Sequence, residues 1–223
     1  MERTPEPELM EDEAQAHAYA STDWSEPHDR FVALLRERLP DLDQSGCALD
    51  LGCGAADIAI RLAQALPGWS IDGIDGSAAM LRHGRVAVAR ARLAERITLR
   101  LGQLPHTDAP RVCYDLVFSN SLLHHLAEPL VLWEAVQDFA RDGADVFVMD
   151  LLRPATREEA QRLTDRHAAG GSEIVRGDFY RSLRAAYTPD EVREQLEIAE
   201  LLEVEVAVAS DRHWIAWGPV LRR

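Results

Sequence analysis

The chain has 223 residues, which is enough for one α/β domain with a sizeable core and short for two. Its formal net charge is −14, and every basic side chain except His is Arg because the sequence contains no Lys. The negative charge disfavours a nucleic-acid partner, since phosphate contacts supply most of that affinity. The absence of Lys excludes P-loop and Schiff-base lysine chemistry, and the use of Arg alone suggests a GC-rich bacterial genome.

The sequence also limits where the protein works. No run approaches the roughly 18 apolar residues of a membrane span, and the acidic, proline-rich N-terminus differs from a secretory signal. The cysteines are scattered, odd in number and without zinc spacing, which suits a reducing compartment. We therefore expect a cytoplasmic protein with no membrane segment and no metal site. Nothing in the pattern indicates an oligomeric state.

Residues 1–14 are acidic with few apolar side chains, and we expect them to be disordered. A single domain is expected over 15–223. It opens with a helical cap, 15–40, in which residues 28–39 place apolar side chains on one helical face before Pro40 ends the pattern.

A regular alternation of strands and helices follows the cap. Strands are expected at 47–52, 69–75, 96–101, 114–120 and 144–152, and helices at 55–66, 77–91 and 129–140. Such alternation predicts a parallel sheet with helices on both faces.

The alternation breaks after Pro154. Residues 156–187 form an insert with helical patterns at each end. Thr188, Pro189 and Glu191 then predict a capped helix start. The last two predicted strands, 203–210 and 213–220, are joined by so short a link that we expect an antiparallel hairpin.

A glycine-rich turn, Asp50-Leu51-Gly52-Cys53-Gly54, joins the first strand to its helix. In open parallel sheets ligands bind beyond the carboxyl ends of the strands, where glycine lets the backbone approach and a helix N-terminus offers free N–H groups. A dinucleotide fingerprint would place a third glycine where Asp57 stands, and this carboxylate would repel a pyrophosphate. A zwitterionic amino-acid tail fits better, with Asp50 accepting from its ammonium.

The second strand ends in Asp75-Gly76. A carboxylate at this position can accept hydrogen bonds from both hydroxyls of an adenosine ribose. The two turns together therefore predict an adenosine ligand that carries an amino-acid tail.

These segments resemble the motifs of the class I S-adenosylmethionine (SAM)-dependent methyltransferases. The resemblance covers about residues 45–153 and rests on LDLGCGAADIAIRLAQALPGWSIDGIDGS, YDLVFSNSLLHHL and DVFVMDLLRP, in the family's order. It implies a Rossmann-like seven-stranded sheet of order 3-2-1-4-5-7-6 with strand 7 antiparallel. It also implies SAM as cofactor. Two positions depart from the family pattern: Ala56 replaces a frequent third glycine, and Gln103 stands where an acidic residue often lies near the adenine.

Further cofactor contacts are expected from Asn120, whose backbone lies near the amino-acid end of SAM, and from Trp24, which either closes over SAM or packs in the core. His124 and His125 follow the fourth strand, where the methyl acceptor is expected. One of them acts there as a general base, or the pair serves only for capping and packing.

The insert 156–187 is expected to form a lid over the acceptor, with Phe179, Tyr180 and Tyr187 in contact with it. Ordinary packing is the alternative. The predicted reaction is transfer of the SAM methyl group to a nucleophilic atom of a small molecule. Three other functions stay open from the sequence: non-methyl chemistry on SAM, a non-catalytic SAM-binding partner subunit, and a nicotinamide oxidoreductase, which Asp57 disfavours.

Overall fold

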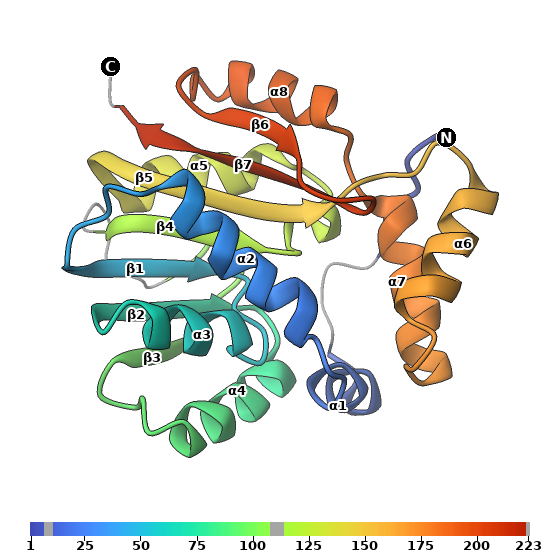
Figure 1. The fold of residues 1–223 in the computed structure, drawn as a ribbon, viewed down its shortest axis with the longest axis horizontal. Helices are drawn as coiled ribbons and strands as arrows, with labels where there is room; N and C mark the ends of the chain where they lie inside the picture. The colour runs from blue at the N-terminus through green and yellow to red at the C-terminus, as the bar shows by residue number, and fades with distance from the viewer. Residues whose placement is uncertain (7–10, 108–113, 222–223) are drawn as a thin grey trace.

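A computed structural model describes residues 1–6, 11–107 and 114–221. Its strands form one sheet in the order β3-β2-β1-β4-β5-β7-β6 (Figure 1). They are β1 Ser45–Leu51, β2 Gly68–Asp75, β3 Ile97–Leu101, β4 Tyr114–Asn120, β5 Ala140–Leu151, β6 Glu205–Val208 and β7 His213–Val220. β1 to β5 pair in parallel, whereas β7 pairs antiparallel with both β5 and β6. The predicted fold class and the C-terminal hairpin are confirmed.

Two apolar cores separate the sheet from helices on its two faces. On one face, α2 Ser25–Arg38, α3 Asp57–Ala65 and α4 Ala78–Arg90 cover side chains such as Phe118 and Phe147. On the other, α5 Leu130–Phe139 and α8 Pro189–Ile198 cover Val117 and Val146. Successive strand residues point to opposite faces, so neighbours in β4 and β5 serve different cores. In the described part of the chain, no helix is long and apolar enough to span a bilayer.

Three helices lie beyond the carboxyl ends of the parallel strands, as Figure 1 shows. They are α1 Glu13–Ala20, α6 Arg157–His167 and α7 Glu173–Ala185. A short 3-10 helix, η1 Leu123–His125, follows β4 at the same edge. Gly170 and Gly171 lie in the turn between α6 and α7, at the end of this pair far from β5 (Figure 1).

Residues 1–6, for which we expected disorder, contact the rest of the chain in the structure. Arg3 donates to the carbonyl oxygen of Ala185 at the end of α7 (2.6 Å) and to those of His124 (3.1 Å) and Leu126 (3.2 Å). The backbone N–H of Thr4 donates to Arg184 (2.9 Å). The last carbonyls of a helix lack intrahelical partners, and one guanidinium supplies donors for several of them. The amino-acid composition of residues 1–6 gives no sign of these contacts with the helix ends. Residues 7–10 lie outside the described residues.

Gly84 shows how tightly α4 packs on the turn after β1. A Cβ at this position would lie 3.3 Å from backbone atoms of Gly54 and Ala55 and 3.0 Å from Leu99 Cδ1. We expect Gly84→Ala to lower the free energy of unfolding by up to about 2 kcal/mol, because an overpacking cost of about 1–3 kcal/mol outweighs the gain of about 1 kcal/mol in helix propensity. Urea denaturation checks this. Gly170→Ala, where no atom lies within 4 Å of the new Cβ, is the control and should change stability little. A more stable Gly84→Ala variant would contradict the packing argument.

Candidate active site

A cavity of about 850 Å³ opens at the carboxyl ends of the parallel strands. The turns after β1 and β2 form one wall, and residues of α1, α2, η1 and α7 form the others. All residues predicted to bind the cofactor line this one cavity: Trp24, Asp50, Gly52, Gly54, Asp75, Gly76, Gln103 and Asn120. His124, His125 and Phe179 line it as well.

The turn after β1 depends on its glycines. Gly52 has φ +75° and Gly54 has φ +51°, a region that favours glycine. A Cβ on Gly52 would also lie 2.9 Å from the Leu122 side chain. Ala56 stands at the position of the missing third glycine and adopts φ +64° although it is not a glycine. The turn thus presents bare backbone to the cavity and leads directly into the first turn of α3.

Asp50 is the buried carboxylate of the site. It is 1% exposed, and its Oδ2 has no hydrogen-bond partner among the residues that the structure describes. Burial, followed by the charge of Asp75, raises the pKa of Asp50 well above its usual value. A buried carboxylate is costly without a cationic or hydrogen-bonding partner. Asp50 therefore fits a ligand that brings a positive charge, as the ammonium of SAM does.

Asp75 connects the two turns. Its Oδ2 accepts from the backbone N–H of Gly54 (2.8 Å) and its Oδ1 from that of Ser77 (2.7 Å). Burial raises the pKa of Asp75 despite these two bonds. Each carboxylate oxygen keeps a second lone pair, so Asp75 can shape the glycine turn and accept ribose hydroxyls at once.

Other cofactor candidates lie around these carboxylates. Asn120 ends β4, and its buried Oδ1 has no hydrogen-bond partner among the described residues. Gln103 follows β3 and pairs through its backbone with His106. Trp24, just before α2, donates from Nε1 to the carbonyl of Tyr19 (3.0 Å), with their ring centroids 5.1 Å apart. This contact joins α1 to α2 at the cavity wall.

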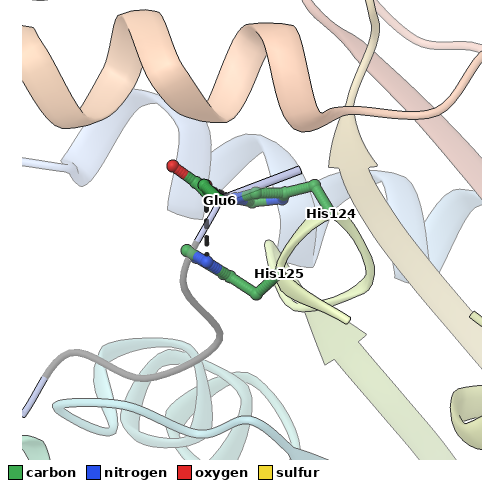
Figure 2. Close-up of side chains that lie close together, drawn as sticks. All are labelled: Glu6, His124 and His125. Atoms are coloured by element: carbon green, nitrogen blue, oxygen red, sulfur yellow. Dashed lines mark ion pairs between the residues drawn. The ribbon is translucent and has the colours of Figure 1, made fainter. Parts of the chain in front are cut away.

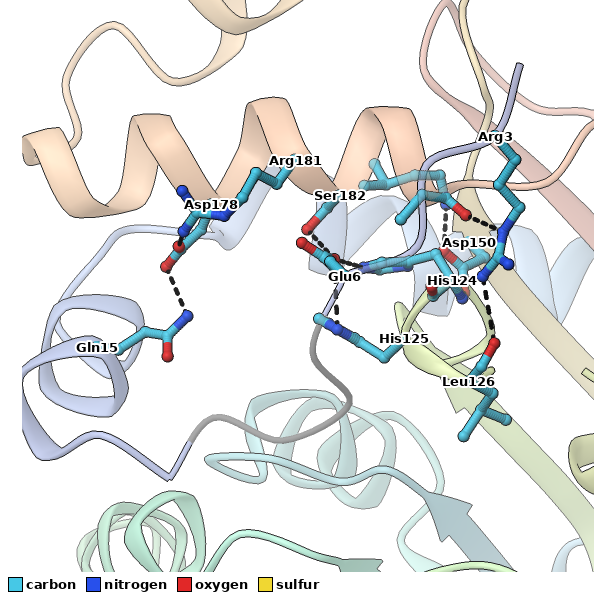
Figure 3. Close-up of polar contacts among 12 residues, drawn as sticks. Arg3, Glu6, Gln15, His124, His125, Leu126, Asp150, Asp178, Arg181 and Ser182 are labelled. Carbon is cyan, nitrogen blue, oxygen red and sulfur yellow. Dashed lines mark hydrogen bonds and ion pairs between the residues drawn. The ribbon is translucent and has the colours of Figure 1, made fainter. Parts of the chain in front are cut away.

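The histidine pair lies in η1, opposite the insert. His124 is buried, and its Nδ1 lies 2.5 Å from Asp150 Oδ1 at the end of β5. Asp150 also accepts from the backbone N–H groups of Leu151 (2.5 Å) and His124 (3.3 Å). Burial favours the neutral imidazole, but the Asp150 carboxylate outweighs it and raises the pKa of His124. Figure 3 shows these contacts converging between η1 and α7.

Only part of the insert reaches the cavity. Phe179 lines it together with Val175 and Ser182, which lie four residues before and three after it on α7. Tyr180 is the next residue along the helix and is absent from the cavity lining, although both this tyrosine and Phe179 pack on the cluster of Leu151 and Ala160.

Tyr187 follows α7, and it too is absent from the cavity lining. Its ring lies 4.1 Å from the Arg3 guanidinium carbon, and its hydroxyl donates to Leu126 (3.4 Å). The predicted substrate contacts of Tyr180 and Tyr187 are therefore not brought to the cavity. The positions of Tyr180 and Tyr187 along the backbone, and not the chemical nature of their side chains, keep them out of the cavity lining.

Two residues of the site were not predicted from the sequence, Glu6 and Asp150. Asp150 carried a usable signal, because it ends a buried strand as Asp50 and Asp75 do. Glu6 carried none, since its partners lie more than a hundred residues away in the chain.

Comparison with known proteins agrees with this geometry. A family model described as a methyltransferase domain matches residues 49–146. An uncharacterized methyltransferase of Mycobacterium tuberculosis is 27% identical over 170 residues, covering 74% of this chain and 80% of the relative. The trans-aconitate 2-methyltransferase of Deinococcus radiodurans is 28% identical over 155 residues, covering 70% of this chain and 55% of the relative.

The fold is shared with solved methyltransferases. A SAM-dependent methyltransferase from Aquifex aeolicus superposes with a TM-score of 0.70 at 18% identity, covering 94% of this chain and 99% of that one. The plantazolicin methyltransferase BpumL, solved with a monoazolic desmethylPZN analogue and S-adenosylhomocysteine (SAH), gives a TM-score of 0.71 at 14% identity, covering 94% of this chain and 90% of that one. The motifs at 50–54 and 75–76, the sheet order and the matched domain lead to one conclusion: the chain is a SAM-dependent methyltransferase with the class I fold.

Proposed function

We propose that this methyltransferase transfers the methyl group of SAM to a small molecule held between η1 and α7. The observation that carries the proposal is Asp50, a buried carboxylate with an unpartnered oxygen beside a glycine turn and beside Asp75. Asp50 would hold the ammonium of SAM, the turn its carboxylate, and Asp75 its ribose. Asn120, Gly76, Gln103 and Trp24 would complete the cofactor site.

The volume of the cavity supports a small acceptor. Its volume of about 850 Å³ lies in the upper part of the range of roughly 300–1,000 Å³ for small-molecule sites. The relatives named for trans-aconitate and the neighbour named for plantazolicin act on molecules other than nucleic acids. The strongly negative net charge supports the same choice.

The sulfonium of SAM already carries an activated methyl group, so the residues of this chain have two tasks. The first is to align the acceptor with the methyl carbon and sulfur, for which Phe179 supplies an apolar wall. The second is to help a protonated acceptor lose its proton, and we assign this task to His124 and His125. Asp150 positions His124 by holding its Nδ1, which leaves Nε2 facing Glu6.

Cofactor choice tests the proposal directly. We expect SAM and SAH to bind and NAD to fail, because the carboxylates of Asp50, in the turn, and of Asp57, at the start of α3, both line the cavity and would repel a pyrophosphate. Calorimetric titration of the purified chain with each ligand measures this. Binding of NAD more tightly than SAH would refute the assignment.

We also propose that α6 and α7 close over the acceptor. The support is the position of Phe179 and Ser182 on the cavity wall and of α7 against η1. Hydrogen exchange should slow in residues 157–185 when SAH and an acceptor are bound, because closure protects backbone amides. Equal exchange with and without ligands would make the helices a fixed wall.

A cytoplasmic, bacterial setting is proposed as well, supported by Cys47 and Cys53, which form no disulfide among the described residues, and by bacterial relatives.

A further inference from the structure

Three side chains that commonly bind metal ions meet beside the cavity, where two of them line its wall. They are Glu6 from the N-terminal segment and the neighbouring His124 and His125 of η1, as Figure 2 shows. Glu6 Oε1 lies 3.3 Å from His125 Nδ1 and 3.6 Å from His124 Nε2. The side chains of Glu6, His124 and His125 are only 7%, 3% and 16% exposed. The carboxylate and the two imidazoles thus come from segments more than a hundred residues apart in the sequence.

The spacing differs from that of hydrogen-bonded ion pairs. Charge-assisted N–H···O bonds are about 2.7–2.9 Å long, shorter than both distances here. Nitrogen and oxygen ligands of Zn²⁺ lie about 2.0–2.2 Å from the ion, so two ligands on a tetrahedron are about 3.3–3.5 Å apart. Glu6 therefore stands at the separation from each imidazole that is expected for ligands sharing one ion, and all three ligand atoms lie within 4.8 Å of one another.

Outer contacts orient these ligands. His124 Nδ1 is held by Asp150 at 2.5 Å, which directs Nε2 toward Glu6. A carboxylate that holds the far nitrogen of a ligating histidine is the common arrangement around bound metals. Ser182 Oγ donates to Glu6 Oε1 at 2.8 Å and fixes the other side of the cluster (Figure 3). Asp150 already supplies the counter-charge for His124, so a second carboxylate is not needed merely to neutralise it.

We propose that Glu6, His124 and His125 bind a divalent transition-metal ion, such as Zn²⁺ or Fe²⁺, whose remaining coordination positions face the methyl acceptor. Two histidines and one carboxylate leave open positions on such ions. The inference rests on the proposed function for the location of the acceptor. It narrows the acceptor class to small molecules with a hydroxyl next to a second oxygen donor, which together can chelate the ion.

The ion would act as a Lewis acid on the acceptor hydroxyl and lower its pKa. The hydroxyl proton passes to solvent water. The oxygen lone pair then forms the new O–C bond to the methyl carbon, while the C–S bond breaks and its electron pair stays on sulfur. His124 and His125 take part in this scheme as ligands. The cysteine spacing gives no sign of this site, and no local pattern in the sequence places Glu6 beside the two histidines.

Metal binding can be measured without knowing the acceptor. The full-length chain, free of any affinity tag, is stripped with a chelator and titrated with Zn²⁺ by calorimetry and with Co²⁺ by visible absorption. We expect about one ion per chain. Glu6→Gln and His125→Ala should each weaken binding by roughly tenfold or more, and Asp150→Asn by roughly tenfold through loss of orientation. Glu2→Gln, from the same segment, and His106→Ala, on an exposed loop, are the matched controls and should bind as the unmodified chain does.

Titration with SAH on the same stripped samples separates two kinds of failure. Normal SAH binding by Glu6→Gln shows that the variant is folded, so its loss of Zn²⁺ affinity then supports the site. No Zn²⁺ binding by the unmodified chain, equal binding by Glu6→Gln, or cobalt–thiolate absorption would overturn the inference and leave the methyltransferase proposal intact. Zn²⁺ binding that depends on Glu6 in a chain that binds no SAH would support the metal site and refute the proposed cofactor site.

Discussion

Asp50→Asn is expected to weaken SAM binding by about 2–4 kcal/mol, a roughly 30- to 900-fold rise in Kd, because truncating one partner of a buried charge pair costs that much. The carboxylate lies 1% exposed and has an oxygen without a hydrogen-bond partner among the described residues. The amide keeps the size of the side chain but removes the charge that would hold the ammonium. The loss should be similar for SAH, which keeps the same amino-acid tail.

The free variant is expected to be more stable than the unmodified chain at pH 7.5. Burial and the Asp75 charge raise the pKa of Asp50 in the folded protein. A folded-state pKa above the unfolded value of about 3.9 means that ionisation favours unfolding, so the carboxylate costs stability once the pH exceeds that value. The stability gain should therefore shrink below about pH 4. The same side chain thus opposes folding and favours binding.

Asp145→Asn offers a matched control for this pair of effects. Asp145 lies in β5, and burial followed by the charge of Asp41 raises its pKa too, but it does not line the cavity. It should gain stability and keep its SAM affinity. Urea denaturation across pH and calorimetric SAM titration measure both quantities. An Asp50→Asn variant that binds SAM normally would remove Asp50 from the cofactor site.

Asp150→Ala should lower the free energy of unfolding by about 3–5 kcal/mol, the cost of breaking a buried ion pair. Its carboxylate is 1% exposed and accepts from His124 Nδ1 and from the backbone N–H groups of Leu151 and His124. Alanine would leave all three donors without this acceptor. Each unsatisfied buried donor is costly, and the charged imidazole is the costliest of them.

The loss should depend on pH in a defined direction. Burial tends to raise the pKa of Asp150, but the charge and hydrogen bond of His124 outweigh it and hold that pKa below its usual value. The Asp150 contribution is therefore present above about pH 3.9 and lost as the pH falls through the depressed pKa. His124 has a raised pKa in the folded protein. Its contribution is therefore complete below the unfolded value of about 6.5 and is lost as the pH rises through the raised pKa. The pair should stabilise most between about pH 4 and 6.5.

A double-mutant cycle between Asp150→Asn and His124→Gln checks the coupling. Urea denaturation of the four proteins at pH 6 should give a coupling free energy of roughly 1–3 kcal/mol. The coupling should decrease at pH 9, where the imidazole is less charged. Additive losses at both pH values would show that the two side chains stabilise the fold independently.

Much of the cofactor site follows from the sequence, for a geometric reason. Asp50 and Asp75 end buried strands, and the carboxyl ends of neighbouring parallel strands meet at one edge of a sheet. Alternating strand and helix patterns were enough to establish that these strands are parallel neighbours. Gly52 and Gly54 stood out because few residues adopt positive φ, and both do so here. Local pattern therefore determined the cofactor side of the cavity, since every residue there lies at the end of a predictable element.

Only the tertiary structure decided the acceptor side. Glu6 reaches His124 through contacts of Arg3 with the ends of α7 and η1, and no local pattern encodes such a match of donors to distant carbonyls. Phe179 faces the cavity and Tyr180 does not because adjacent helical residues point about 100° apart, and the rotation of α7 is set by its packing on α6. Side chains brought together by packing between elements far apart in the chain depend on the whole fold, whereas the glycine turn depends on its own few residues.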